Sequence, residues 1–119
     1  MPISIDYSAH NRILTLTFTD PWTVAELLRT YSQEEYYFNQ FSGRIHTLVD
    51  IRNMHHIPPG ALFHRRSPNL VHPNSGKVAL VGATDTARAI ATTAFSILHF
   101  GRARFFATME EARQYLESD

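Results

Sequence analysis

Side chains able to do acid–base chemistry gather in the middle of the chain. His55 and His56 are adjacent, His64 follows them, and Asp50 precedes all three. Because a histidine oriented by a carboxylate is a common general base, one hypothesis is a small hydrolase or transferase that uses His55, His56 or His64 with Asp50. The sequence has no G-x-S-x-G, P-loop or G-x-G-x-x-G motif. We therefore expect binding without catalysis.

The same histidines, together with His72, raise the question of a metal site. Adjacent residues of an extended segment point in opposite directions, so His55 and His56 rarely reach one ion. No Asp or Glu lies between Asp50 and Asp85, and the chain has no cysteine. We expect neither a metal nor another cofactor.

Charge is unevenly distributed although the net charge is zero. Residues 51–109 hold seven of the 11 cationic side chains, against Asp85 as the one acid. Lys77 is the only lysine, and arginine favours planar contacts with carboxylate or phosphate. This pattern predicts an anion-binding face formed by Arg52, His55, His56, His64, Arg65 and Arg66, the alternative being a solvated surface. Zero net charge and the scarcity of lysine argue against nucleic acid as a partner.

Length and composition indicate one ordinary globular domain over residues 1–119. Residues 1–8 alternate apolar and polar side chains and lack the features of a signal peptide. No apolar stretch approaches the ~20 residues that span a bilayer. The absence of cysteine fits a reducing compartment, so we expect a cytoplasmic protein.

Hydrophobic periodicity predicts the elements that must position these side chains. Alternation over 3–7 and 13–18 predicts a β-hairpin, and a capping box of Thr23 and Glu26 opens a helix over about 23–40. A buried strand over 45–51 is followed by a helix that begins near Pro59 and ends near Arg66, then by an irregular piece up to Pro73.

The rest of the chain alternates strand and helix signals. We expect a central strand over 77–82, a helix from Thr84 or Asp85 to Gly101, a strand over 104–107 and a last helix opened by a capping box at Thr108. The inner stripe of the third helix is expected to be Ala87, Ile90, Ala91, Ala94, Ile97 and Leu98. The order ββαβαβαβα predicts an α/β fold: a five-stranded, mostly parallel sheet with an antiparallel edge strand and four helices.

Several phrases of the sequence resemble the STAS/SpoIIAA-like superfamily, specifically the bacterial STAS/SEC14 domain-containing proteins. They are ISIDYSAHNRILTLTF, PWTVAEL, TLVDIR, KVALVG and ARFFATMEEARQYL. The resemblance implies a SpoIIAA-like fold and a binding role. In anti-sigma-factor antagonists of this family a phosphorylatable serine starts the second helix. Here Pro58 and Pro59 stand in its place, with Asp50 before and Gly60 after, so a phosphorylation switch at that position is not expected.

The resulting hypothesis is a non-catalytic module that binds a protein or a small anionic or amphipathic ligand, with a homo-oligomeric structural subunit as a further alternative. A homodimer is expected to use an exposed face of the third helix. Its residues are Arg88, Thr92, Phe95 and His99, joined by Tyr36 or Tyr37 of the first helix. The alternative is that Phe95 is a partly covered core residue.

Overall fold

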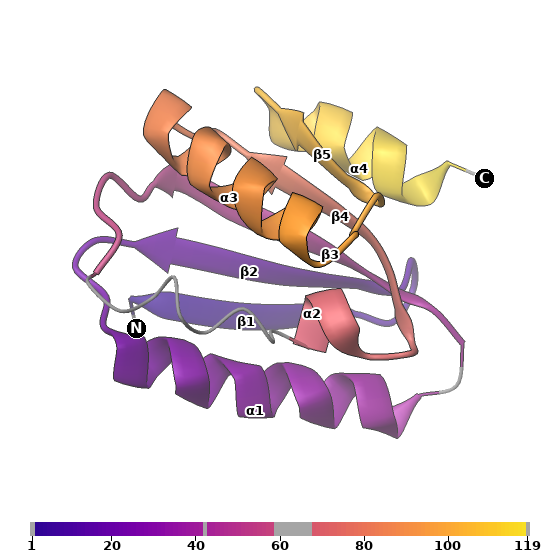
Figure 1. Ribbon diagram of the computed structural model, residues 1–119. Helices are drawn as coiled ribbons and strands as arrows, with labels where there is room; N and C mark the ends of the chain where they lie inside the picture. Colours follow the sequence, from indigo (N-terminus) through magenta and orange to yellow (C-terminus); the bar gives the residue numbers. More distant parts are fainter. Residues whose placement is uncertain (1, 42, 59–67, 119) are drawn as a thin grey trace.

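A computed structural model describes residues 2–41, 43–58 and 68–118 of the chain. It contains one five-stranded sheet with the strand order β1-β2-β3-β4-β5 (Figure 1). β1 (Ile3–Ser8) pairs antiparallel with β2 (Ile13–Thr19), and the remaining neighbours pair parallel. The predicted mixed sheet with an antiparallel edge strand is thereby confirmed.

The predicted capping box opens α1 (Val24–Gln40). The Thr23 hydroxyl accepts a hydrogen bond from the Glu26 backbone N–H at 3.1 Å, and the Glu26 carboxylate accepts one from the Thr23 backbone N–H at 3.0 Å. These contacts satisfy backbone donors that the first helical turn leaves free.

The parallel strands β3 (Ile45–Asn53), β4 (Ser75–Val81) and β5 (Ala103–Phe106) follow β2 in spatial order as well as in sequence. Because β-helix-β crossovers are right-handed, a sheet that always grows in one direction receives every connecting helix on the same face. α1, α2 (Pro68–Val71) and α3 (Asp85–Ile97) accordingly pack on one face. α4 (Met109–Glu117) follows β5 and packs on the other face.

The neighbouring strands β3 and β4 are buried on both faces, as their apolar sequences predict. Leu48 and Ala79 contact the α4 side, and Val49 and Leu80 contact the side of α1 and α3. The layer between the sheet and helices α1, α2 and α3 contains the larger cluster of buried apolar residues, and the candidate site described below lies in it.

The prediction for the segment between β3 and β4 was wrong in part. The helix expected from Pro59 to Arg66 lies outside the described residues. The piece expected to be irregular contains α2, which starts at Pro68 because proline is well suited to the first position of a helix. The described part of the chain thus has three helices of nine or more residues and this single turn, in place of four full helices.

The prediction for α3 also needs two corrections. Ile97 was expected on the inner stripe but is 52% exposed, whereas Phe95 packs against the core. The helix was expected to end at Gly101, but it ends at Ile97 and the left-handed residue after its C-cap is His99, with φ of 54°. The Phe100 backbone N–H then bonds to the Phe95 carbonyl at 2.8 Å, which closes the last turn.

Candidate functional site

A cavity lies between the sheet and helices α1, α2 and α3. Its volume is about 160 Å³, close to the ~150 Å³ of an apolar protein cavity that admits benzene. All of its lining side chains except Tyr31 and Glu34 are hydrocarbon. The lining consists of Leu16, Phe18, Leu27, Tyr31, Glu34, Val49, Leu70, Val78, Leu80 and Phe95.

Glu34 places a carboxyl group in the wall of this cavity. It belongs to the inner stripe of α1 with Leu27 and Phe38, and only 1% of its surface is exposed. Within the described residues neither carboxyl oxygen has a hydrogen-bond partner. Since buried polar groups in folded proteins almost always have partners, a buried carboxyl without one marks a place where a ligand group is expected.

Burial sets the ionisation state of this carboxyl. Removal from water disfavours the charged form and raises the pKa of Glu34 from 4.5 to about 8. At neutral pH the neutral acid form of Glu34 therefore predominates. Burial, and to a smaller extent the Glu34 carboxyl, also raises the pKa of Tyr31, the other titratable side chain of the described lining.

The acid and the arginine expected at the end of β3 form an ion pair with each other. Arg52 Nε donates to Asp50 Oδ1 at 2.9 Å, and Arg52 Nη2 donates to Asp50 Oδ2 at 2.8 Å. These hydrogen bonds lower the pKa of Asp50. The Asp50 carboxylate thus accepts two hydrogen bonds from the Arg52 guanidinium. Among the described residues it has no hydrogen bond to a histidine.

The other predicted site residues fall into two groups. His55 and His56 are exposed and line a separate hollow of about 250 Å³ beside the start of α3. The His55 backbone N–H donates to Asp20 Oδ2 at 2.6 Å. His64, Arg65 and Arg66 lie outside the described residues. In the described ranges, no three His, Cys, Asp or Glu side chains are close enough together to hold a metal ion.

The four residues expected at a dimer interface do not share one exposed face. Arg88, Thr92 and His99 are exposed, and the Arg88 guanidinium lies 4.9 Å from the centre of the Phe105 ring. Phe95 points into the core, where its ring centre is 5.8 Å from that of Phe100, and it lines the cavity. Of the four residues predicted on α3, three are therefore exposed: Arg88, Thr92 and His99.

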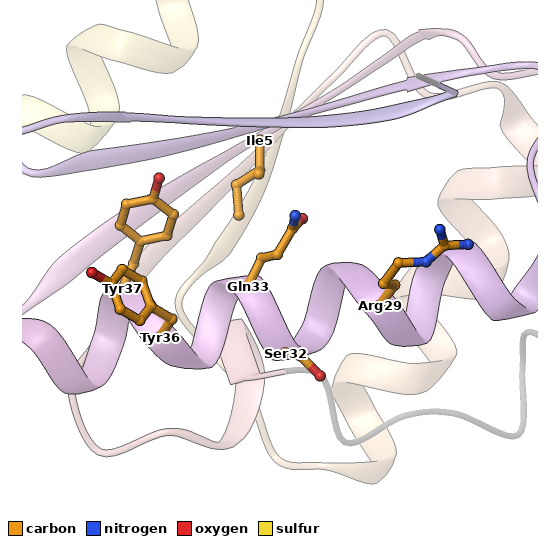
Figure 2. A pocket seen from close by; sticks show the side chains of 6 residues that line it. All are labelled: Ile5, Arg29, Ser32, Gln33, Tyr36 and Tyr37. Atoms are coloured by element: carbon orange, nitrogen blue, oxygen red, sulfur yellow. The ribbon is translucent and has the colours of Figure 1, made fainter.

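A second concave feature is an open groove of about 350 Å³ between α1 and the edge strand β1. Figure 2 shows Ile5 of β1 facing Gln33 and Tyr37 of α1, with Arg29 further along the helix. Tyr36 and Ser32 complete its lining, and Tyr36 is 61% exposed. Tyr36 and Tyr37 thus lie at the β1 edge of the molecule.

Sequence reasoning missed the cavity and its carboxyl group, although a signal was present. Glu34 follows Leu27 by seven residues and Tyr31 by three, and it precedes Phe38 by four, so helical periodicity alone puts an acid on the apolar stripe of α1. An acid at such a buried position is expected to pair with a cation, to be protonated, or to bind a ligand.

The described chain thus combines a mixed five-stranded sheet, helices on both of its faces, and a largely apolar cavity under α1, α2 and α3. The SpoIIAA-like family model matches residues 13–117, and the chain belongs to this family. SpoIIAA-like domains are STAS-type modules that bind or regulate. A search of curated proteins found no match. Among the described residues, no helix is long and apolar enough to cross a membrane.

Proposed function

We propose that the chain is a non-catalytic module that binds a small amphipathic ligand in the cavity between α1, α3 and the sheet. The observation that carries this proposal is the buried Glu34 carboxyl, which has no described partner and lies in an otherwise hydrocarbon wall. Ligand sites typically combine an apolar lining with a few polar groups that fix orientation, and this cavity has that composition.

The energetics favour occupancy of the cavity. Transfer of an apolar ring or short alkyl chain from water into such a cavity is favourable by roughly 25 cal/mol per Å² of apolar surface removed from water. A polar group of the ligand near Glu34 adds a hydrogen bond that the carboxyl otherwise lacks, and satisfying a buried group is more valuable than forming the same bond at the surface.

Titration with toluene, followed by NMR of the methyl groups that line the cavity, tests whether the cavity accepts an apolar probe. We expect saturable shifts at Val78 and Leu80. Val78→Phe places a ring in the cavity and should abolish them. The matched control is Val81→Phe on the same strand, because Val81 packs on the opposite face under α4. Absence of saturable shifts in the wild type, or equal effects of both variants, would contradict the proposal.

A second candidate function, self-association, is favoured by the edge strand β1. The Thr19 backbone N–H donates to the Pro2 carbonyl at 2.7 Å, so Pro2 and Thr19 are a hydrogen-bonded pair of the antiparallel ladder. Because such pairs alternate, Ile3, Ile5 and Tyr7 direct their backbone groups away from β2. No described strand pairs with that edge, and β1 has neither a lysine nor a bulge to protect it. A second copy could add its own β1 antiparallel.

Ile5→Pro separates this candidate from the first. Proline at position 5 removes one outward N–H and leaves the hydrogen bonds to β2 intact. If copies associate through β1, sedimentation at micromolar concentration will show a dimer that Ile5→Pro weakens at least tenfold and the conservative Ile5→Val preserves. A wild-type monomer, or a dimer that tolerates Ile5→Pro, rules out this edge as the contact.

A further inference from the structure

The polar wall of the Glu34 cavity limits the chemistry of its ligand, and this inference rests on the binding function proposed above. We propose that the ligand is an uncharged molecule with a body about the size of one ring and a single hydroxyl or carboxamide head that hydrogen-bonds to the Glu34 carboxylic acid. Three features of the site lead to this class: its polarity, its burial and the hydrogen-bonding capacity of a neutral carboxyl group.

An anionic head does not fit this wall. The described lining contains no cation, and its two titratable groups are an acid and a phenol, Glu34 and Tyr31. A ligand carboxylate or phosphate would lose its hydration and gain no opposite charge, which is strongly unfavourable in an apolar environment. Of the residues predicted to bind an anion, Arg52, His55 and His56 are described, and none of these three lines the cavity.

A cationic head fits poorly for a related reason. An ammonium group would need Glu34 in its ionised form, and the resulting ion pair would be buried among hydrocarbon side chains. Buried ion pairs are favourable only where further hydrogen bonds satisfy the remaining donors and acceptors. Of the described lining, Tyr31 alone offers another polar atom.

A neutral head with both a donor and an acceptor matches a neutral carboxyl group. A protonated carboxyl has one O–H donor and a carbonyl acceptor. A hydroxyl group can accept from the first or donate to the second, and a primary carboxamide can do both at once. The raised pKa of Glu34, about 8 because of burial, agrees with this arrangement, since the acid form predominates at neutral pH.

The direction in which ligand affinity changes with pH follows from the protonation state of Glu34 that binds the ligand. A ligand that binds the acid form has constant affinity well below pH 8 and loses affinity as Glu34 ionises above that value, by up to tenfold per pH unit. The described lining residues come from α1, α2, α3, β2, β3 and β4. Besides Glu34, Tyr31 is the one titratable group among them, and its pKa is raised as well.

A matched set of benzyl and phenyl compounds tests the inference, with NMR titrations of the full chain at pH 6.5. The probes are toluene, benzyl alcohol, benzamide, benzylamine and benzoate. We expect benzyl alcohol and benzamide to bind about tenfold more tightly than toluene, as one well-made buried hydrogen bond implies. Benzylamine and benzoate should bind more weakly than toluene.

Two variants of Glu34 make the test specific. Glu34→Gln keeps a donor and an acceptor and should retain the preference for benzyl alcohol while removing its loss above pH 8. Glu34→Leu should bind toluene and show no preference for the head group. If benzylamine binds best and Glu34→Gln abolishes its binding, the head is a cation and the inference is overturned. If toluene binds but no head group improves affinity, the inference fails and the binding function stands; if toluene does not bind either, the binding function itself fails.

Discussion

The Glu34 carboxyl gives the sharpest prediction about stability, because its pKa differs strongly between the folded and unfolded chain. In the folded chain the pKa is about 8, against an ordinary value of 4.5. Because the folded-state pKa of this acid is raised, the unfolded chain releases the proton first. The contribution of Glu34 to stability is therefore fully present below pH 4.5 and is lost as the pH rises to 8. Each unit of difference corresponds to about 1.4 kcal/mol, so the full loss is on the order of 3 to 5 kcal/mol.

Glu34→Gln removes this contribution and leaves a side chain of nearly the same size. The free energy of unfolding of the variant minus that of the wild type should rise by about 3 to 5 kcal/mol between pH 4.5 and pH 8.5. This rise is expected whether the variant is more or less stable than the wild type at pH 4.5. Urea unfolding at a series of pH values measures the difference, with equal m-values required for the comparison. Glu35→Gln on the exposed face of α1 is the control and should show no such change.

The result that would refute this reasoning is a constant difference between the wild type and Glu34→Gln across the pH range. It would mean that Glu34 is ionised in the folded chain and therefore has a partner or access to water. A change of the same size in Glu35→Gln would assign the pH dependence to surface charge.

Three further predictions concern packing, backbone and charge. Val78→Phe should change the free energy of unfolding by less than about 1 kcal/mol because the ring enters the cavity, whereas Val81→Phe should cost roughly 1 to 3 kcal/mol, both by urea unfolding. Gly82→Ala should destabilise by at least about 1 kcal/mol, since Gly82 has φ of 79°, and a thermal melt checks this. If Arg65 and Arg66 belong to an anion-binding face, changing both to Gln should weaken phosphate binding at low salt several-fold in calorimetry; unchanged affinity would count against that face.

Most of the fold could be predicted from sequence because its signals are local. Alternation at Ile3 and Ile5, the capping box at Thr23 and the apolar run that ends at Gly82 each determine one element, and the handedness of crossovers then determines the layers. The exact end of α3 could not be predicted in this way. Its left-handed cap is His99, and glycine at position 101 offered a more usual choice.

The candidate site was much less predictable, because it depends on contacts between distant segments. Arg52 was predicted to belong to an anion-binding face, and the sequence did not predict that Asp50, two residues earlier, forms two side-chain hydrogen bonds with it. For Phe95 the sequence left two alternatives open, an interface residue beside Thr92 and His99 or a partly covered core residue, and tertiary packing toward Phe100 and Phe105 gives the second. Glu34 was not singled out at all, since only the packed structure reveals how completely it is buried.

The most direct test of the account is a crystal structure of the chain grown with benzyl alcohol. The account predicts density for the ring among Leu16, Val78 and Phe95, with the hydroxyl oxygen within about 3 Å of a Glu34 carboxyl oxygen. A cavity that is collapsed or filled by water under these conditions, with the compound bound elsewhere or absent, would contradict it.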